Sequence, residues 1–242
     1  MTACAVLIAL SIAAAGCGRA FARTYEYEED IHLSLDGSAT VYVNASVPAL
    51  VALRGVDLPL DPAARLDRSV VRAIYESPLS HVENVSLSRR EGRRYVHLRI
   101  DVPDIRTLGS VPAFAWASYR MDTRGNLFVY QQQLGAAAGR DAGAAGWNGD
   151  ELIAVRLHLP SRVPFHNQPQ HEIQRGNIIV WEQPLAARRA GEPLNIEAHM
   201  EQDSILFKTL GLFGLMIVLV AITFAVAIWW VMRRGKAEEG SA

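Results

Sequence analysis

An uncharged, strongly apolar segment near the C-terminus constrains this sequence more than any other feature. Thr209 to Met232 comprises 24 consecutive residues without a charge, and most of them are Leu, Ile, Val, Phe or Ala. At about 1.5 Å per residue, a helix of this length reaches roughly 36 Å, enough to cross a hydrocarbon core of about 30 Å with some tilt. The sequence therefore predicts a transmembrane helix, which we assign with its flanks to residues 207–234.

The flanks of this segment indicate its orientation. Aromatic and basic side chains gather at its C-terminal end, where the expected membrane-interface anchors are Trp229, Trp230, Arg233, Arg234 and Lys236. Positively charged flanks favour the cytoplasmic side of a membrane. We therefore expect residues 235–242 to form a short cytoplasmic tail at the inner membrane, with the bulk of the chain outside the cytoplasm.

The N-terminal residues have the pattern of an export signal. Residues 3–16 form an apolar run of signal-peptide length that is too short to span a bilayer. Two cleavage sites are compatible with it. The AAGC sequence resembles a lipobox, in which cleavage after residue 16 is followed by lipidation of Cys17, whereas the AFA sequence ending at Ala22 suits an ordinary signal peptidase. We assign residues 1–22 to the signal peptide and keep the lipobox as the alternative.

Composition limits the chemistry of the exported domain, which we assign to residues 23–206. The only cysteines are Cys4 and Cys17, so this domain has neither a disulfide scaffold nor a thiolate metal site. A formal net charge of -1 gives no basic footprint for nucleic acid. The domain is therefore expected to have no nucleic-acid partner.

Alternating apolar residues predict a domain built from antiparallel hairpins. In the first hairpin, a three-residue loop around Asp36-Gly37 would pair Leu35 with Ala39. Two further hairpins and three later strands are expected at residues 82–88 with 95–102, 114–121 with 127–134, and then 152–159, 178–182 and 194–200. Gly- and Ala-rich residues 135–149 predict a flexible loop between two lobes, the second of them wholly β.

One helix is predicted within this domain. Asp61-Pro62 has the pattern of an N-cap followed by a first-turn proline, and Leu66, Val70 and Ile74 then recur every four residues. This stripe would cover one face of the sheet. The predicted fold class is therefore α+β: an antiparallel sheet of hairpins with one amphipathic covering helix, plus a single C-terminal transmembrane helix.

The sequence contains no catalytic signature. Nucleophile elbows, Ser-x-x-Lys, phosphate loops and dinucleotide fingerprints do not occur, so we predict a protein that is not an enzyme, with no catalytic residues and no cofactor. His166 and His171, beside Glu172, are potential zinc ligands, but a zinc site needs about three or four suitably spaced ligands. We interpret them as solvated loop histidines and predict no metal site.

Four arginines at the tip of the second hairpin are the best candidate for a contact with an anionic ligand. These residues are Arg89, Arg90, Arg93 and Arg94. Their guanidinium groups could engage lipid head groups or sugar phosphates, with each basic group worth on the order of 1 kcal/mol near a membrane surface. A solvated turn would carry the same residues without a ligand, so both interpretations remain open.

The layout of the chain resembles the LppM-type envelope lipoproteins of mycobacteria. The shared features are a leader with a lipobox-like sequence, a strand-turn-strand opening at Asp36-Gly37, the late segment Gly176-Asn177-x-x-x-Trp181 and a C-terminal span with a basic end. The resemblance implies an outer β-rich domain, binding of envelope glycolipids and no catalytic residues. We therefore expect a non-catalytic, single-pass bacterial envelope protein that binds membrane lipid, glycolipid or another membrane protein. The alternative is a structural or accessory subunit of a membrane complex.

Overall fold

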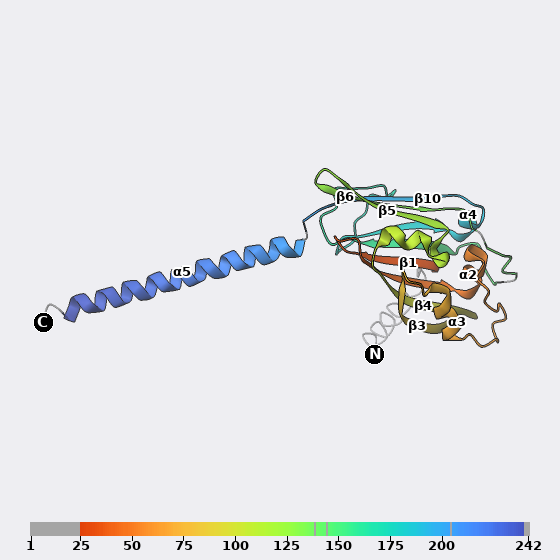
Figure 1. Cartoon of the computed structure of the whole chain (residues 1–242), viewed down its shortest axis with the longest axis horizontal. Coiled ribbons are helices and arrows are strands. Elements are labelled where there is room, and N and C mark those ends of the chain that lie inside the picture. The colour runs from red at the N-terminus through yellow and green to blue at the C-terminus, as the bar shows by residue number, and fades with distance from the viewer. Residues whose placement is uncertain (1–24, 138, 144, 204, 240–242) are drawn as a thin grey trace, which may run out of the picture.

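The structure of the protein, a computed structural model, describes residues 25–137, 139–143, 145–203 and 205–239. Figure 1 shows a β-rich domain from which one long helix, α5 (Ile205–Glu239), projects away. The predicted α+β class with one C-terminal apolar helix is confirmed. The predicted signal peptide and lipidation site Cys17 lie outside the described residues.

Six strands form the larger sheet, in the order β3-β4-β2-β1-β7-β9. Neighbouring strands are antiparallel except β1 and β7, which run parallel. Buried and more exposed residues alternate along β2, so the sheet has one apolar and one polar face. The strands are β1 (Tyr25–Leu33), β2 (Ala39–Ser46), β3 (His81–Arg90), β4 (Arg93–Val102), β7 (Leu152–His158) and β9 (Ile178–Pro184).

Four strands form the smaller sheet, in the order β5-β6-β10-β8, with antiparallel neighbours throughout. Its apolar face packs against that of the larger sheet, and Figure 1 shows the two sheets as stacked layers. The structure thus refines the predicted sheet of hairpins into two sheets that share one core. The strands are β5 (Ala117–Arg124), β6 (Leu127–Leu134), β8 (Phe165–His166) and β10 (Leu194–Glu201).

The first hairpin forms with a register that differs from the predicted one by two residues. Leu33, and not Leu35, pairs with Ala39, so the loop has five residues rather than three. Asp36 Oδ1 accepts hydrogen bonds from the backbone N–H and the hydroxyl of Ser38, at 2.9 and 2.7 Å, which stabilise this longer loop. A shift of two residues keeps every side chain on its predicted face.

The predicted covering helix is shorter than expected and begins later. Helix α3 (Arg68–Tyr75) has Asp67 as its N-cap, whose side chain accepts a hydrogen bond from the backbone of Ser69 at 2.8 Å. Because the helix begins at residue 68, it buries Val71 and Tyr75, whereas Val70 of the predicted stripe remains 48% exposed. Helix α3 packs against β3 at one side of the larger sheet.

A second covering helix was missed by the prediction. Helix α2 (Val47–Arg54) is buried from Val47 to Leu53, so it has no polar face that would reveal a helical period. Its ends do carry helix signals. The Ser46 hydroxyl accepts a hydrogen bond from the backbone of Ala49 at 3.1 Å, and Gly55 ends the helix with a φ of 66°.

The two predicted lobes interleave. Strands β7 and β9 of the second lobe extend the sheet of the first, and β8 and β10 extend the β5–β6 hairpin. The second lobe is not wholly β as predicted, because α4 (Leu185–Arg189) follows β9. Its sequence, LAARR, consists of strong helix formers. Two short 3-10 helices, η1 (Ile105–Ser110) and η2 (Pro112–Phe114), connect β4 to β5.

Helix α5 has the properties predicted for a transmembrane segment. Thr209–Trp230 has a mean hydropathy of 2.7, and none of it is buried inside the protein. It is long and apolar enough to cross a membrane. Of the predicted interface anchors, Trp229 and Trp230 expose about half of their surface, at 58% and 49%, and the backbone of Arg233, Arg234 and Lys236 continues the same helix.

Candidate functional site

The β3–β4 hairpin carries the four candidate arginines at the end of the domain farthest from α5. Glu91 and Gly92 form its turn, both with positive φ angles, of 51° and 76°. Near this tip, Tyr95 of β4 pairs with Ser46, the residue that precedes α2. Figure 1 shows α2 and α5 at opposite ends of the domain. We call the end with α2 and the hairpin tip the distal end, and the end from which α5 leaves the proximal end.

Arg93 is buried and pairs with a buried carboxylate. Its Nε lies 3.1 Å from an oxygen of Glu26, a carboxylate with no exposed surface. Arg93 also donates to the carbonyl oxygen of Gly146 at 3.0 Å and pairs with Glu91 at 3.1 Å. Arg93 therefore holds the hairpin tip against β1 and the 135–149 loop.

The buried carboxylate of Glu26 has two further partners. Tyr95 donates its hydroxyl to Glu26 at 2.6 Å, and Trp147 donates its indole N–H at 3.1 Å. Burial, and then the hydrogen bond and charge of Glu26, raise the pKa of Tyr95, which keeps the phenol protonated as a donor. The buried carboxylate of Glu26 thus has one cationic partner, Arg93, and two hydrogen-bond donors, Tyr95 and Trp147.

Arg94 is also buried and serves a neighbouring loop. It donates to the carbonyl oxygen of Ala64 at 2.8 Å and to that of Pro59. Burial, followed by the nearby charge of Arg89, lowers the pKa of Arg94. Two of the four predicted contact residues therefore fix loops instead of extending into solvent.

Arg89 and Arg90 remain exposed at the tip. The Arg90 guanidinium lies over the ring of Tyr95, 4.8 Å from its centroid, and donates to the Tyr95 hydroxyl at 3.1 Å. The structure therefore divides the predicted cluster into two outward and two inward arginines. An anionic ligand at this hairpin would meet Arg89 and Arg90 first.

A groove of about 470 Å³ opens beside the hairpin tip. Four segments form its walls: the start of α2, the loop before α3, the β3–β4 hairpin tip and the 135–149 loop. Its surface is mostly apolar, and four charged residues are among those that line it. The lining residues are Pro48, Leu60, Asp61, Pro62, Glu91, Gly92, Arg93, Arg94, Ala142, Gly143, Ala145 and Gly146. Arg94 also lines a second, smaller groove of about 310 Å³ that Arg89 borders.

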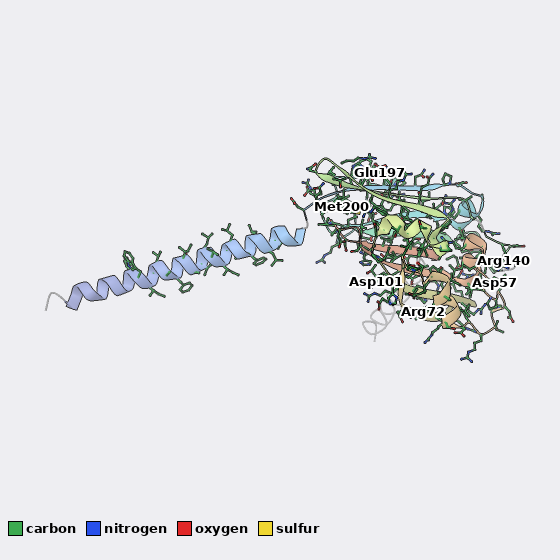
Figure 2. The ribbon with its side chains drawn as sticks, in the orientation of Figure 1. Asp57, Arg72, Asp101, Arg140, Glu197 and Met200 are labelled. Carbon is green, nitrogen blue, oxygen red and sulfur yellow. The ribbon has the colours of Figure 1, made fainter. Side chains whose placement is uncertain are left out.

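The loop that forms one wall of this groove is attached to α2. Gly139 lies so close to this helix that a Cβ atom would stand 1.8 Å from the carbonyl oxygen of Ala52. The next residue, Arg140, donates its backbone N–H to Val51 at 3.0 Å, and its guanidinium pairs with Asp57 at 3.0 Å. Figure 2 shows Arg140 and Asp57 together at the distal end. The predicted loop thus has no helix or strand among its described residues, yet makes specific contacts.

The loop histidines lie near each other at the edge of the smaller sheet. The ring centroids of His166 and His171 are 5.9 Å apart. Burial lowers the pKa of His166, which is 7% exposed. Among the described residues, the metal-ligating groups that converge are instead Asp30, His32 and His158, which the sequence analysis did not single out.

Comparison with solved structures reveals a likeness of fold. No family model matches the sequence, and no curated protein matches it. The chain is similar to the folded domain of Mycobacterium tuberculosis LppM, whose NMR structure it matches with 15% sequence identity and a TM-score of 0.42. The match covers 77% of this chain and 95% of that domain. The predicted resemblance to LppM-type proteins is confirmed at the level of the fold.

Proposed function

We propose that this chain is a single-pass envelope protein whose exported domain binds a lipid or glycolipid in the distal groove, without catalysis. The groove carries the proposal. Its volume of about 470 Å³ lies within the range of about 300–1,000 Å³ that ligand sites occupy. Its apolar wall suits an acyl chain, and Arg89 and Arg90, which are exposed at the hairpin tip, suit an anionic head group.

The distal position determines which ligands this site could meet. If α5 crosses the membrane, the length of the domain separates the groove from that membrane. Arg89 and Arg90 would then face away from the anchoring bilayer. The proposed ligand therefore comes from the surrounding envelope or from an opposing surface. The hairpin tip is not proposed to attach to the bilayer that holds α5.

Replacing Leu60 with glutamate is expected to abolish ligand binding while leaving the fold intact. Leu60 is 36% exposed and lines the groove, so a carboxylate there would place a charge against an acyl chain. The measurement is native mass spectrometry of the full chain extracted in detergent, with co-purifying lipid as the signal. The matched control is Val70→Glu, since Val70 is 48% exposed on α3 and does not line the groove.

The same measurement separates the competing functions. Lipid on the wild type and on Val70→Glu, with none on Leu60→Glu, supports the proposal. Equal lipid on all three proteins, or lipid on none, contradicts it. A co-purifying polypeptide would support the alternative of an accessory subunit. That alternative rests on Phe165, an apolar side chain that is 46% exposed on the edge strand β8. Strand β8 pairs with β10, which ends shortly before α5.

A reporter attached after Ala242 tests the orientation of α5. We expect it to be active only if it functions in the cytoplasm, because Arg233, Arg234 and Lys236 follow the apolar segment. A matched fusion after Asp203, which precedes α5, should be active only with a reporter that requires export. The opposite pair of results would place the domain in the cytoplasm and would rule out an envelope ligand.

A further inference from the structure

Parallel pairing of β1 with β7 brings two distant histidines together on the polar face of the larger sheet. His32 is the Cα partner of His158 in this ladder, although 125 residues separate them in the chain. Their rings stack with centroids 3.8 Å apart and an interplanar angle of 17°. Asp30 lies on the same face of β1, two residues before His32.

The three side chains direct their ligating atoms at one another. Asp30 Oδ1 lies 2.7 Å from His158 Nε2 and 3.4 Å from His32 Nε2. All three ligating atoms lie within 4.8 Å of one another. A tetrahedral Zn²⁺ ion, with bonds of about 2.0–2.2 Å, holds its ligand atoms about 3.3 Å apart. The 3.4 Å separation matches this value, the 2.7 Å separation is shorter, and none exceeds 4.8 Å, so the three atoms are near enough to share one ion.

The closest of these contacts is not a hydrogen bond. Asp30 Oδ1 and His158 Nε2 are shielded from solvent, and neither has a partner with hydrogen-bond geometry among the described residues. A shielded acceptor without such a partner is costly for a folded protein. A bound cation would satisfy both atoms, since a carboxylate oxygen and an imidazole nitrogen each present a lone pair to it.

We propose that Asp30, His32 and His158 form a binding site for a divalent transition-metal ion of the Zn²⁺ type. Two imidazoles and one carboxylate are a ligand set that zinc uses with a fourth, open position for water or another ligand. The His32 side chain is 46% exposed, so this position faces solvent. The site differs from the distal groove in location and in ligand chemistry.

The charges around the three residues are compatible with a cation. Arg156 lies opposite Asp30 in the β1–β7 ladder, but its guanidinium pairs with Glu28 at 2.9 Å.

The site lies toward the proximal end of the domain. His158 is the last residue of β7, and Arg162 soon after it accepts a hydrogen bond from the backbone of Glu201, at 2.9 Å. Glu201 ends β10, which leads into α5. The proposed ion would therefore lie on the part of the domain nearest the membrane helix.

Calorimetric titration of the metal-free full chain in detergent with ZnCl₂ tests the proposal. We expect one Zn²⁺ to bind per chain. His158→Gln and His32→Gln should each weaken binding by at least about 10-fold, because loss of even an outer-shell partner of a metal ligand costs about 10–100-fold in affinity. Co²⁺ in place of Zn²⁺ should give visible absorption that both variants lose.

Two controls separate this site from other histidines. His81→Gln removes a histidine on β3 that also lies beside carboxylates, 2.8 Å from Glu76, and it should bind Zn²⁺ as the wild type does. The double variant His166→Gln/His171→Gln removes the loop pair and should do the same. No binding by the wild type, or equal affinity in His158→Gln, overturns the proposal. Circular dichroism of each metal-free variant shows whether it is folded.

Discussion

Replacing Arg93 with serine is expected to lower the free energy of unfolding by about 3 kcal/mol, although the sequence places this residue at the tip of a hairpin. The substitution leaves the carboxylate of Glu26 buried without its cationic partner, and removal of one member of a buried ion pair costs about 3–5 kcal/mol. Tyr95 and Trp147 still donate to Glu26, so we expect the lower end of this range.

Urea denaturation of the full chain in detergent measures this effect, with tryptophan fluorescence as the signal because Trp147 belongs to the same network. Arg89→Ser is the matched control: Arg89 is exposed on the same hairpin, and surface substitutions of this kind change stability by no more than about 0.5 kcal/mol. Equal stabilities of the two variants would show that Arg93 does not stabilise the distal end.

If all four arginines were replaced together, a loss of binding could not be distinguished from a change in the fold. Arg93 and Arg94 fix the loops that form the groove, so their loss would change its walls. The informative binding variant is the double replacement of Arg89 and Arg90, which are exposed. A requirement for these two residues would assign the anionic contact to the outer side of the tip.

The hairpins could be predicted because each one buries a single face. Residues 39–45 and 194–201 alternate between the core and the outside, and a period of two is visible in a single sequence. Helix α2 could not be found in this way, since its residues Val47 to Leu53 are all buried. Its signals are confined to its two ends, Ser46 and Gly55.

Pairing between distant strands left no local signal in the sequence. Strands β1 and β7 have adjacent positions in the sheet, but the residues between them form five other strands, β2 to β6. The encounter of Asp30 and His32 with His158 depends on that pairing, so metal-ligand spacing along the chain could not reveal it. His166 and His171 were considered as ligands because they are close in sequence. Closeness in sequence does not imply that the ligating atoms of three residues converge in space.

The arginine tip shows a second limit of local reasoning. Arg90, Arg93 and their neighbours are equally polar in sequence, but β4 places Arg93 against the buried Glu26. That burial depends on Trp147, from a loop more than 50 residues away, which covers the same carboxylate. A charged residue at a hairpin tip can thus be a structural residue when a distant acid is buried beneath it.

Glu29 forms a second buried polar network, between the two sheets. It has no exposed surface, and it accepts hydrogen bonds from Tyr27 at 2.9 Å and from Tyr119 and Gln132 at 2.8 Å each. Two of these donors come from β5 and β6, so the carboxylate connects the larger sheet to the smaller one. Burial raises the pKa of Glu29, although the three hydrogen bonds oppose that shift.

Glu29→Ala is expected to lower the free energy of unfolding by about 3–5 kcal/mol, because it leaves three buried donors without an acceptor and creates a cavity. Glu29→Gln is the matched control. Its amide oxygen can accept from Tyr119 and Gln132, and its NH₂ group can donate to the Tyr27 hydroxyl, so we expect a much smaller loss. Thermal unfolding of the full chain in detergent measures both.

The glutamine variant should also change how stability depends on pH. Below the ordinary glutamate pKa of 4.5, Glu29 is protonated in both the folded and the unfolded chain and makes no difference between them. As the pH rises through that value, the unfolded chain releases the proton while the folded chain retains it, so stability falls until the buried carboxyl ionises. Glu29→Gln removes this decline. The stability of Glu29→Gln relative to wild type should therefore increase as the pH rises from 4.5 toward the raised pKa of the folded state. If the difference in stability between the two proteins stays constant across this pH window, burial does not raise the pKa of Glu29.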